Sequence, residues 1–164
     1  MTKEGYTSNE RIKEESDFLR GNISDLLHDG SITHFPSEEE FLLKFHGITQ
    51  QDNRDERLIR KKNGQERNWL FMLRLRLPGG RMTPSQWLAA ETLSDQFGNG
   101  TLKLTTRQAI QIHGVVKQDL KQTMKDIHHA AITTIAASGD ATRNVMVSPV
   151  SYTHLRAHET CADL

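Results

Sequence analysis

The chain of 164 residues has only one cysteine, Cys161, and 6% aromatic residues. A single thiol excludes an internal disulfide and any metal site built from several cysteines within these residues. The formal net charge is zero, with 21 basic and 21 acidic residues. No global field therefore attracts the chain to nucleic acid or to a membrane, and any electrostatic function must be local.

Long apolar runs are also missing. No run approaches the length of a membrane span, and residues 1–20 carry charges throughout, so we expect no signal peptide and a cytoplasmic protein. The hydrophobic fraction is low, at 35%. This indicates that part of the chain packs against something outside it.

What the sequence does contain centres on residues 69–149. Over residues 69–77 the odd positions are large and apolar, whereas Arg74 and Arg76 occupy even positions. Because successive side chains of a strand point to opposite faces, this pattern predicts a strand with one apolar face and two guanidinium groups on the other. Pro78, Gly79 and Gly80 then end it.

A helix is predicted to begin after Thr83. Thr83 is a favourable N-cap, Pro84 suits the first helical position, and Gln86 completes a capping box. Apolar residues recur at roughly helical spacing as far as Phe97, and Gly98 can end the helix.

Two strands, a helix and a last strand are predicted to follow. Residues 102–105 and 110–113 alternate between apolar and polar, with a tight connection that favours an antiparallel pair, so that Leu102, Leu104, Ile110 and Ile112 would share one face. From Asp119 an apolar stripe that includes Ile135 predicts a helix ending at residues 138–140. Residues 143–147 predict the last strand.

The order βαββαβ is that of the ferredoxin-like fold. We therefore predict an α+β fold class, a ferredoxin-like half-domain with a helical N-terminal arm before it. Both helices must cover one face of the sheet. The other face would gather Arg74, Arg76, Lys103, Arg107, Gln111 and His113. This face is too polar to be core, and we interpret it as a surface for a polyanionic ligand; a solvated face with ordinary surface charge is the alternative.

The predicted organisation is an arm over residues 1–40, a half-domain over 41–149 and a tail over 150–164. In the arm, residues 10–19 and 22–28 predict short helices that lie along another surface. Residues 41–48 predict a strand. The almost wholly polar stretch 50–68 predicts a loop, whose first part could touch a cofactor or a partner.

Several separated motifs resemble the sirohaem nitrite and sulfite reductase family. They are Lys44-Phe45-His46-Gly47, Gln50-Gln51-Asp52, Leu73-Arg74-Leu75-Arg76-Leu77-Pro78-Gly79-Gly80, Leu104-Thr105-Thr106-Arg107-Gln108, Gln111-Ile112-His113-Gly114 and Arg143-Asn144-Val145. The resemblance runs from about Lys13 to Val147. The first two motifs favour the haemoprotein (beta) subunit of assimilatory NADPH-dependent sulfite reductase.

The resemblance implies an oxidoreductase that reduces sulfite to sulfide with six electrons in sulfur assimilation and cysteine biosynthesis. Its cofactors would be sirohaem and a 4Fe–4S cluster, and NADPH would supply electrons through a flavoprotein (alpha) subunit. By resemblance, Arg74 and Arg143 bind the sulfite anion, whereas sirohaem is contacted by Lys103, Arg107, Gln111 and His113. Arginine forks suit the many carboxylates of sirohaem. Lys103 stands where we expect arginine, so the charge is kept but the fork is lost.

His113 and His46 are expected to be hydrogen-bonded histidines rather than iron ligands. The family holds its cluster with cysteine thiolates, and none of those cysteines is present, so no metal ligand is predicted. We therefore expect the N-terminal part of a longer enzyme, inactive alone. Residues 150–160 resemble one reading frame of a transposon adapter used in sequencing libraries, which predicts a non-native tail.

Other functions fit less well. A ferredoxin-dependent sulfite or nitrite reductase would share the same fold. A stand-alone RNA-binding module has the same element order, but such modules stack bases on aromatic residues of the sheet. Here the central strands offer Lys103, Thr105, Gln111 and His113 instead, so no nucleic-acid partner is predicted. Nothing positive supports a small metabolite-binding domain, and no membrane partner is expected.

Overall fold

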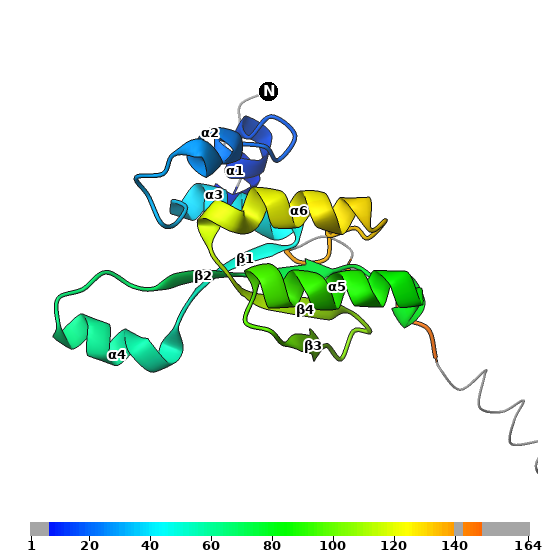
Figure 1. The fold of residues 1–164 in the computed structure, drawn as a ribbon. Helices are drawn as coiled ribbons and strands as arrows, with labels where there is room; N and C mark the ends of the chain where they lie inside the picture. The colour runs from blue at the N-terminus through cyan, green and yellow to red at the C-terminus, as the bar shows by residue number, and fades with distance from the viewer. Residues whose placement is uncertain (1–6, 140–142, 149–164) are drawn as a thin grey trace, which may run out of the picture.

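The computed structural model describes residues 7–139 and 143–148. Its centre is a four-stranded antiparallel sheet in the order β1-β2-β4-β3 (Figure 1). The strands are β1 (Ile48–Asp52), β2 (Trp69–Leu75), β3 (Leu102–Leu104) and β4 (Ile110–Val115). The helices are α1 (Ser8–Glu15), α2 (Ile23–His28), α3 (Ser37–Leu43), α4 (Arg54–Lys62), α5 (Pro84–Phe97) and α6 (Leu120–His129). The α+β class and the ferredoxin-like half-domain preceded by helices are confirmed.

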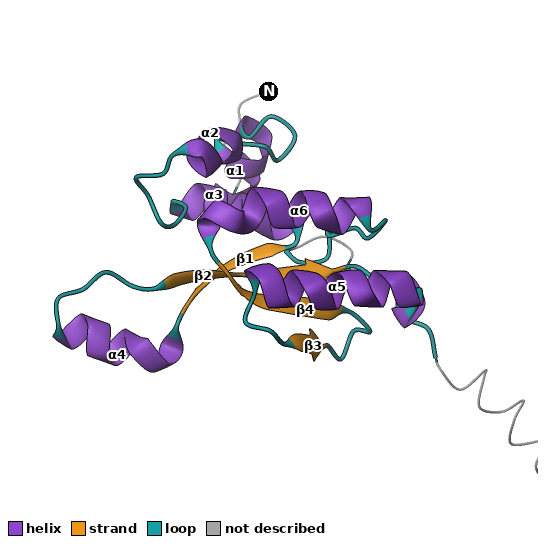
Figure 2. Cartoon of the chain, viewed as in Figure 1, coloured by secondary structure: helices purple, strands orange, loops and turns teal. Residues whose placement is uncertain are grey.

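The core lies between the sheet and the helices α5 and α6, which run side by side over one face (Figure 2). The odd positions of β2 point into it as predicted, with Phe71, Leu73 and Leu75 fully buried. Each such side chain contributes about 1.5–3 kcal/mol on burial. Leu104 was expected in this layer but is 74% exposed, because β3 is a three-residue strand at the edge of the sheet.

The helix α5 begins as the sequence predicts. The Thr83 hydroxyl accepts from the Gln86 backbone N–H at 3.2 Å, and the Gln86 side-chain oxygen accepts from the Thr83 N–H at 2.9 Å. Thus the capping box satisfies two backbone donors that the first turn leaves without partners.

The predicted length of the second helix was wrong. The helix α6 ends at His129, and Ala131 follows with φ of +54°. Ile135 was expected on the buried stripe but is 59% exposed. The residues after α6 run back along the sheet instead, where Thr133 forms an antiparallel bridge with Arg76.

The identity of one edge strand also differs from the prediction. Residues 143–147 form no strand, and the place beside β2 is taken by β1, with Ile48 opposite Leu73. The predicted strand over 41–48 is instead the end of α3 and the 3₁₀ turn Lys44–His46. Gly47 joins this turn to β1 with φ of +79°, where a Cβ would lie 2.3 Å from the Thr134 carbonyl oxygen.

The helix α4 occupies part of the stretch that was predicted to be a loop. Its N-cap is Asn53, whose side-chain oxygen accepts from the Asp55 N–H at 3.1 Å. Acidic residues occupy its first turn and basic residues its last, and Arg60 pairs with Glu56 at 2.9 Å. Charges of this arrangement favour a helix without an apolar stripe, and the sequence pattern therefore missed it. With the ends of β1 and β2, α4 projects from the sheet (Figure 1).

The arm packs on the helical side of the molecule. Partly buried Ile23, Leu26 and Leu27 lie against the core, and Phe35 is buried within it. Lys117, which precedes α6, donates from its ammonium group to the Asp29 carbonyl at 2.5 Å. The arm is therefore joined to the half-domain by both apolar and polar contacts.

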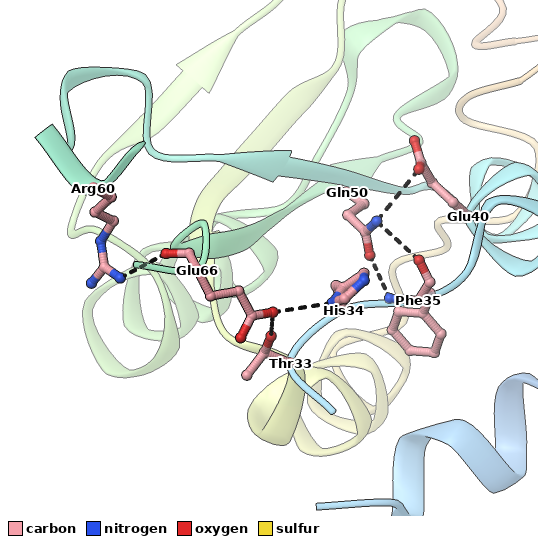
Figure 3. A network of polar contacts seen from close by, with 7 residues as sticks. All are labelled: Thr33, His34, Phe35, Glu40, Gln50, Arg60 and Glu66. Carbon is pink, nitrogen blue, oxygen red and sulfur yellow. Dashed lines mark hydrogen bonds and ion pairs between the residues drawn. The ribbon is translucent and has the colours of Figure 1, made fainter. Parts of the chain in front are cut away.

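A polar network joins the same arm to β1 (Figure 3). The buried Gln50 side chain accepts from the Phe35 N–H at 2.7 Å and donates to the Phe35 carbonyl at 3.2 Å. Glu66, just before β2, accepts from the Thr33 hydroxyl at 3.0 Å, while its carbonyl accepts from Arg60 at 3.0 Å. These contacts hold the segment before α3 along the start of the sheet.

Among the residues that the structure describes, no helix combines the length and the apolar character needed to cross a bilayer. The predicted tail over 150–164, including Cys161, lies outside the described residues.

Candidate functional site

Side chains from three strands form a row on the sheet face that α5 and α6 leave uncovered. In the strand register Gln111 of β4 stands between Arg74 of β2 and Lys103 of β3. His113 follows Gln111 on the same face, two residues along β4. The structure therefore brings four of the predicted site residues together, although their roles remain predictions.

Gln111 holds the guanidinium of Arg74. With its amide oxygen toward β2, that oxygen accepts from Arg74 Nε at 3.1 Å and from Nη2 at 2.6 Å. The amide nitrogen then donates to His113 Nε2 at 3.2 Å. His113 consequently acts as an acceptor at Nε2 and carries its proton on Nδ1 in the neutral form. This chain of contacts fixes the orientation of all three side chains.

The segment 143–148 brings Arg143 to the same face without forming a strand. Asn144 is buried, and its amide donates to the carbonyls of Arg107 at 2.8 Å and Gln108 at 2.9 Å. The Gln108 amide in turn accepts from the Val147 N–H at 2.9 Å and donates to the Val147 carbonyl at 2.6 Å. Arg143 is thereby held beside the turn that carries Arg107.

Sequence reasoning assigned no role to Asn144 or Gln108. Both lie within the motifs that carried the family resemblance, and this was the only signal that could have pointed to them. Their contacts cross more than thirty residues of sequence, so no local pattern could predict them.

The site is positively charged and partly desolvated. Burial lowers the pKa of Arg74, and the nearby charges of Arg143 and Arg107 lower it further. Burial also lowers the pKa of His113, as do the charges of Lys103 and Arg74. Within the described ranges, no carboxylate forms an ion pair with any of these cations. A bound anion would therefore relieve a repulsion that the folded chain already contains.

Arg76 is engaged by the segment after α6, and its place on the cationic face stays a prediction. Its backbone N–H donates to the Thr133 carbonyl at 2.7 Å, and its Nη1 donates to the Ile135 carbonyl at 3.4 Å. The segment after α6 therefore engages both the backbone and the side chain of Arg76.

A cavity of about 760 Å³ continues from the row toward β1 and α4. Lys103 and His113 line one side of it, and Gln51, Asn53 and Arg54 are among the residues on the other. The carboxylates of Asp52 and Asp55 also line this cavity. Asp52 accepts from Arg57 Nε at Oδ2, at 2.6 Å. In the described part of the chain, no group of three or more His, Cys, Asp or Glu side chains is arranged to hold a metal ion.

Known proteins share both the sequence and the fold. Residues 63–130 match the nitrite/sulfite reductase ferredoxin-like half domain. The chain is 53% identical over 160 residues to the sulfite reductase (NADPH) subunit beta of Saccharomyces cerevisiae, a match that covers 96% of this chain and 11% of that protein. It is 48% identical over 143 residues to the sulfite reductase (NADPH) hemoprotein beta-component of Bacillus subtilis, covering 87% of this chain and 25% of the relative.

Among solved structures, the NirA protein of Mycobacterium tuberculosis superposes with a TM-score of 0.68 at 18% identity. That match covers 87% of this chain and 27% of NirA, and it supports the fold alone. The chain spans about a quarter or less of the length of the curated relatives named above. It belongs to the nitrite/sulfite reductase family: it contains the ferredoxin-like half domain of that family and is homologous to part of the beta haemoprotein of NADPH-dependent sulfite reductase.

Proposed function

We propose that this chain supplies part of the anion-binding and cofactor-binding surface of an assimilatory NADPH-dependent sulfite reductase haemoprotein. The observation that carries the proposal is the group of Arg74, Arg107 and Arg143 on one face, close enough for the latter two to lower the pKa of Arg74. Like charges gathered in a partly desolvated place are unfavourable unless an anion joins them. The relatives are named as sulfite reductases, and sulfite is such an anion.

In this proposal Arg74 and Arg143 bind the sulfite anion. Hydrogen bonds from guanidinium groups to an anion are charge-assisted and roughly twice as strong as neutral ones. Gln111 engages Nε and Nη2 of Arg74 and so positions the guanidinium before the substrate arrives. Asn144 holds the backbone next to Arg143 by donating to the carbonyls of Arg107 and Gln108. The sulfite oxygens would therefore meet one guanidinium, that of Arg74, that is already oriented.

The residues also fit a carboxylate-rich macrocycle. Lys103, Arg107, Gln111 and His113 would hold sirohaem, because they provide cations and hydrogen-bond donors. Of these four, Lys103 and His113 line the cavity of about 760 Å³. When bound, sirohaem and its 4Fe–4S cluster would pass to sulfite the six electrons that its reduction to sulfide requires, and NADPH would be their source. Lys103 lies on the edge strand and is exposed, which suits a contact with a peripheral carboxylate. His113, whose Nε2 accepts from Gln111, serves as a hydrogen-bonding residue and not as an iron ligand.

The same proposal gives the chain a flavoprotein (alpha) subunit as its electron donor, with NADPH as the source of electrons, in the cytoplasm. A ferredoxin donor, or nitrite as substrate, is the alternative within the family. The cysteines that hold the cluster are not among these residues, whose only cysteine is Cys161. We therefore propose that the chain works as part of a longer polypeptide and is inactive alone.

A chimera tests this function. Residues 7–148 replace the homologous region of the Bacillus subtilis enzyme, and sulfide production and sirohaem absorbance are measured. We expect an active chimera in which Arg74→Ala lowers kcat/KM for sulfite by about a hundredfold and leaves sirohaem content nearly unchanged. Arg11→Ala, an exposed position on α1, is the matched control and should have no effect. Equal loss of sirohaem and activity would make Arg74 a structural residue and contradict its proposed role.

A second measurement needs no chimera. Sulfite added to the chain itself should raise the pKa of His113, because the anion offsets the charges of Lys103 and Arg74 that lower it. The titration is followed by NMR of the imidazole signals, with chloride at the same ionic strength as the control. An unchanged pKa at saturating sulfite, together with an inactive chimera, would overturn the proposal.

A further inference from the structure

A second hollow lies on the helical side of the molecule, away from the cationic sheet face. It is a groove of about 390 Å³ between α2 and α6. Its floor is apolar and draws on the arm, the turn before β1 and the sheet itself. The apolar lining residues are Ile23, Leu27, Leu43, Ile48, Leu120 and Met124.

The rim of this groove carries one sign of charge. Lys121 and Lys125 follow one another along α6 at a spacing of four residues, which places them on one face of the helix. Arg20 also lines the groove and pairs with Asp17 at 3.6 Å. The rest of the polar lining is Ser24, His28, His46 and His128. Among the described residues no acidic side chain lines the groove. The rim is therefore complementary to an anion.

Lys121 is held in place at this rim. His28 Nδ1 lies 2.6 Å from the Ser24 carbonyl oxygen, which can only accept, so Nδ1 carries the proton. Its Nε2 must then accept, and the Lys121 ammonium donates to it at 2.8 Å. An ammonium group has three donors, so two remain for a ligand at the mouth of the groove. No ion pair of Lys121 or Lys125 with a carboxylate is present in the described part of the chain.

The size of the groove decides between a peptide helix and a small molecule. Its volume falls at the lower end of the range for small-ligand sites, about 300–1,000 Å³. The helix α2 has six residues, about 9 Å of length. A helix bound in a groove usually places anchors over two turns, about 10 Å or more, so α2 is too short to form one wall of such a groove.

We propose that the groove between α2 and α6 is a binding site for a small amphipathic carboxylate, an anion with an apolar body the size of a medium-chain fatty acid. The apolar body would lie on the floor, near Leu27 and Met124, and the carboxylate would meet the ammonium groups of Lys121 and Lys125. The site is independent of the proposed sulfite reductase function, because it shares no residue with the cationic sheet face.

Octanoate is the probe, added to the full chain and followed by calorimetry and by amide NMR shifts. We expect saturable binding at one site, with a Kd of about 0.1–1 mM for a ligand of this size and shifts confined to α2, α6 and the turn before β1. Acetate has the charge without the apolar body, and 1-octanol has the body without the charge. Acetate should not bind measurably, and 1-octanol should bind at least about tenfold more weakly than octanoate.

Charge-reversal variants test the rim. Lys121→Glu and Lys125→Glu should each weaken octanoate binding by about tenfold or more. Lys62→Glu makes the same charge change at the exposed end of α4 and should leave binding unchanged, which removes any effect of net charge. The proposal is overturned if octanoate gives no saturable shifts in this region, if 1-octanol binds as tightly, or if Lys62→Glu and Lys121→Glu have equal effects.

Discussion

Replacement of Gly47 by alanine tests the close contact between the turn before β1 and the segment after α6. Its φ of +79° lies in the left-handed region, and an added Cβ would lie 2.3 Å from the Thr134 carbonyl oxygen and 2.8 Å from Thr134 Cβ. Ordinary contacts of a Cβ begin near 3.4 Å, so Gly47→Ala requires the segment around Thr134 to withdraw by about 1 Å. Movement of that segment would weaken the backbone hydrogen bonds that it forms.

The expected destabilisation has two parts. The left-handed conformation costs an L-residue about 1–2 kcal/mol. Withdrawal of the segment weakens two backbone hydrogen bonds, Arg76 N–H to the Thr133 carbonyl at 2.7 Å and Ala136 N–H to the Phe45 carbonyl at 2.8 Å. Each contributes about 0.5–1.5 kcal/mol net. The free energy of unfolding should therefore fall by about 3 kcal/mol, a large share of the ~5–15 kcal/mol of an ordinary domain.

Two other glycines allow the two contributions to the destabilisation to be measured separately. Gly64 also has a positive φ, of +66°, but no atom lies within 4 Å of its added Cβ, and Gly30 has open space and no positive φ. Gly64→Ala should lose only the backbone term, about 1 kcal/mol, and Gly30→Ala should lose nothing or gain up to about 0.5 kcal/mol.

Urea unfolding of the full chain, followed by circular dichroism, measures all three variants. With a slope of about 2 kcal/mol per molar urea, the midpoint should fall by about 1.5 M for Gly47→Ala and about 0.5 M for Gly64→Ala. Equal losses at the two positions would show that the backbone conformation accounts for the whole loss at Gly47. The segment around Thr134 would then withdraw at no measurable cost, which would refute the reasoning.

Three further outcomes are expected. Thr83→Ala removes the hydroxyl that caps α5 and should lower the free energy of unfolding by about 1 kcal/mol, whereas Ser at this position should keep most of it in the same urea assay. Burial lowers the pKa of Lys117 below 10.5, so the unfolded chain binds more protons than the folded chain and the free energy of unfolding should rise as the pH increases toward that value. Lys117→Met should remove this part of the rise, which urea unfolding at about pH 8 and about pH 10 would measure. His113 should titrate below 6.5, and Arg74→Gln should raise its pKa, as measured by NMR; an unchanged value would remove Arg74 as a cause.

The parts of the fold that were predictable have short-range causes. The alternation over β2 reports which of its faces is apolar, and Phe71, Leu73 and Leu75 are buried as expected. The capping box of Thr83 and Gln86 lies within four residues, and it forms as predicted. The motifs that carried the resemblance were sufficient to identify the family.

The parts that were missed depend on charge pairs or on distant segments. The helix α4 is stabilised by its cap and its charges, as between Arg60 and Glu56, and it has no apolar stripe for a periodicity to reveal. The end of α6 was misplaced because the stripe continues to Ile135 in sequence, whereas Thr133 pairs with Arg76 across the sheet.

The candidate site was predictable in part. Arg74, Lys103, Gln111 and His113 fall on one face of their strands through alternation, which is a local pattern. The register that sets Arg74 opposite Gln111 joins two distant strands and is not. The contact of Arg76 with the Ile135 carbonyl could not be foreseen, since it joins residues 59 apart in the chain.

Motifs and periodic patterns are properties of neighbouring residues, and they were enough to establish the family, the α+β class, the two faces of β2 and the start of α5. The folded chain was needed to show that β1 rather than residues 143–147 pairs with β2. It alone also placed Arg143 beside the turn at Arg107, through Asn144. The strand β1 is almost wholly polar, so no apolar pattern marks it in the sequence. Its pairing with β2 and the place of Arg143 depend on contacts between residues far apart in the chain.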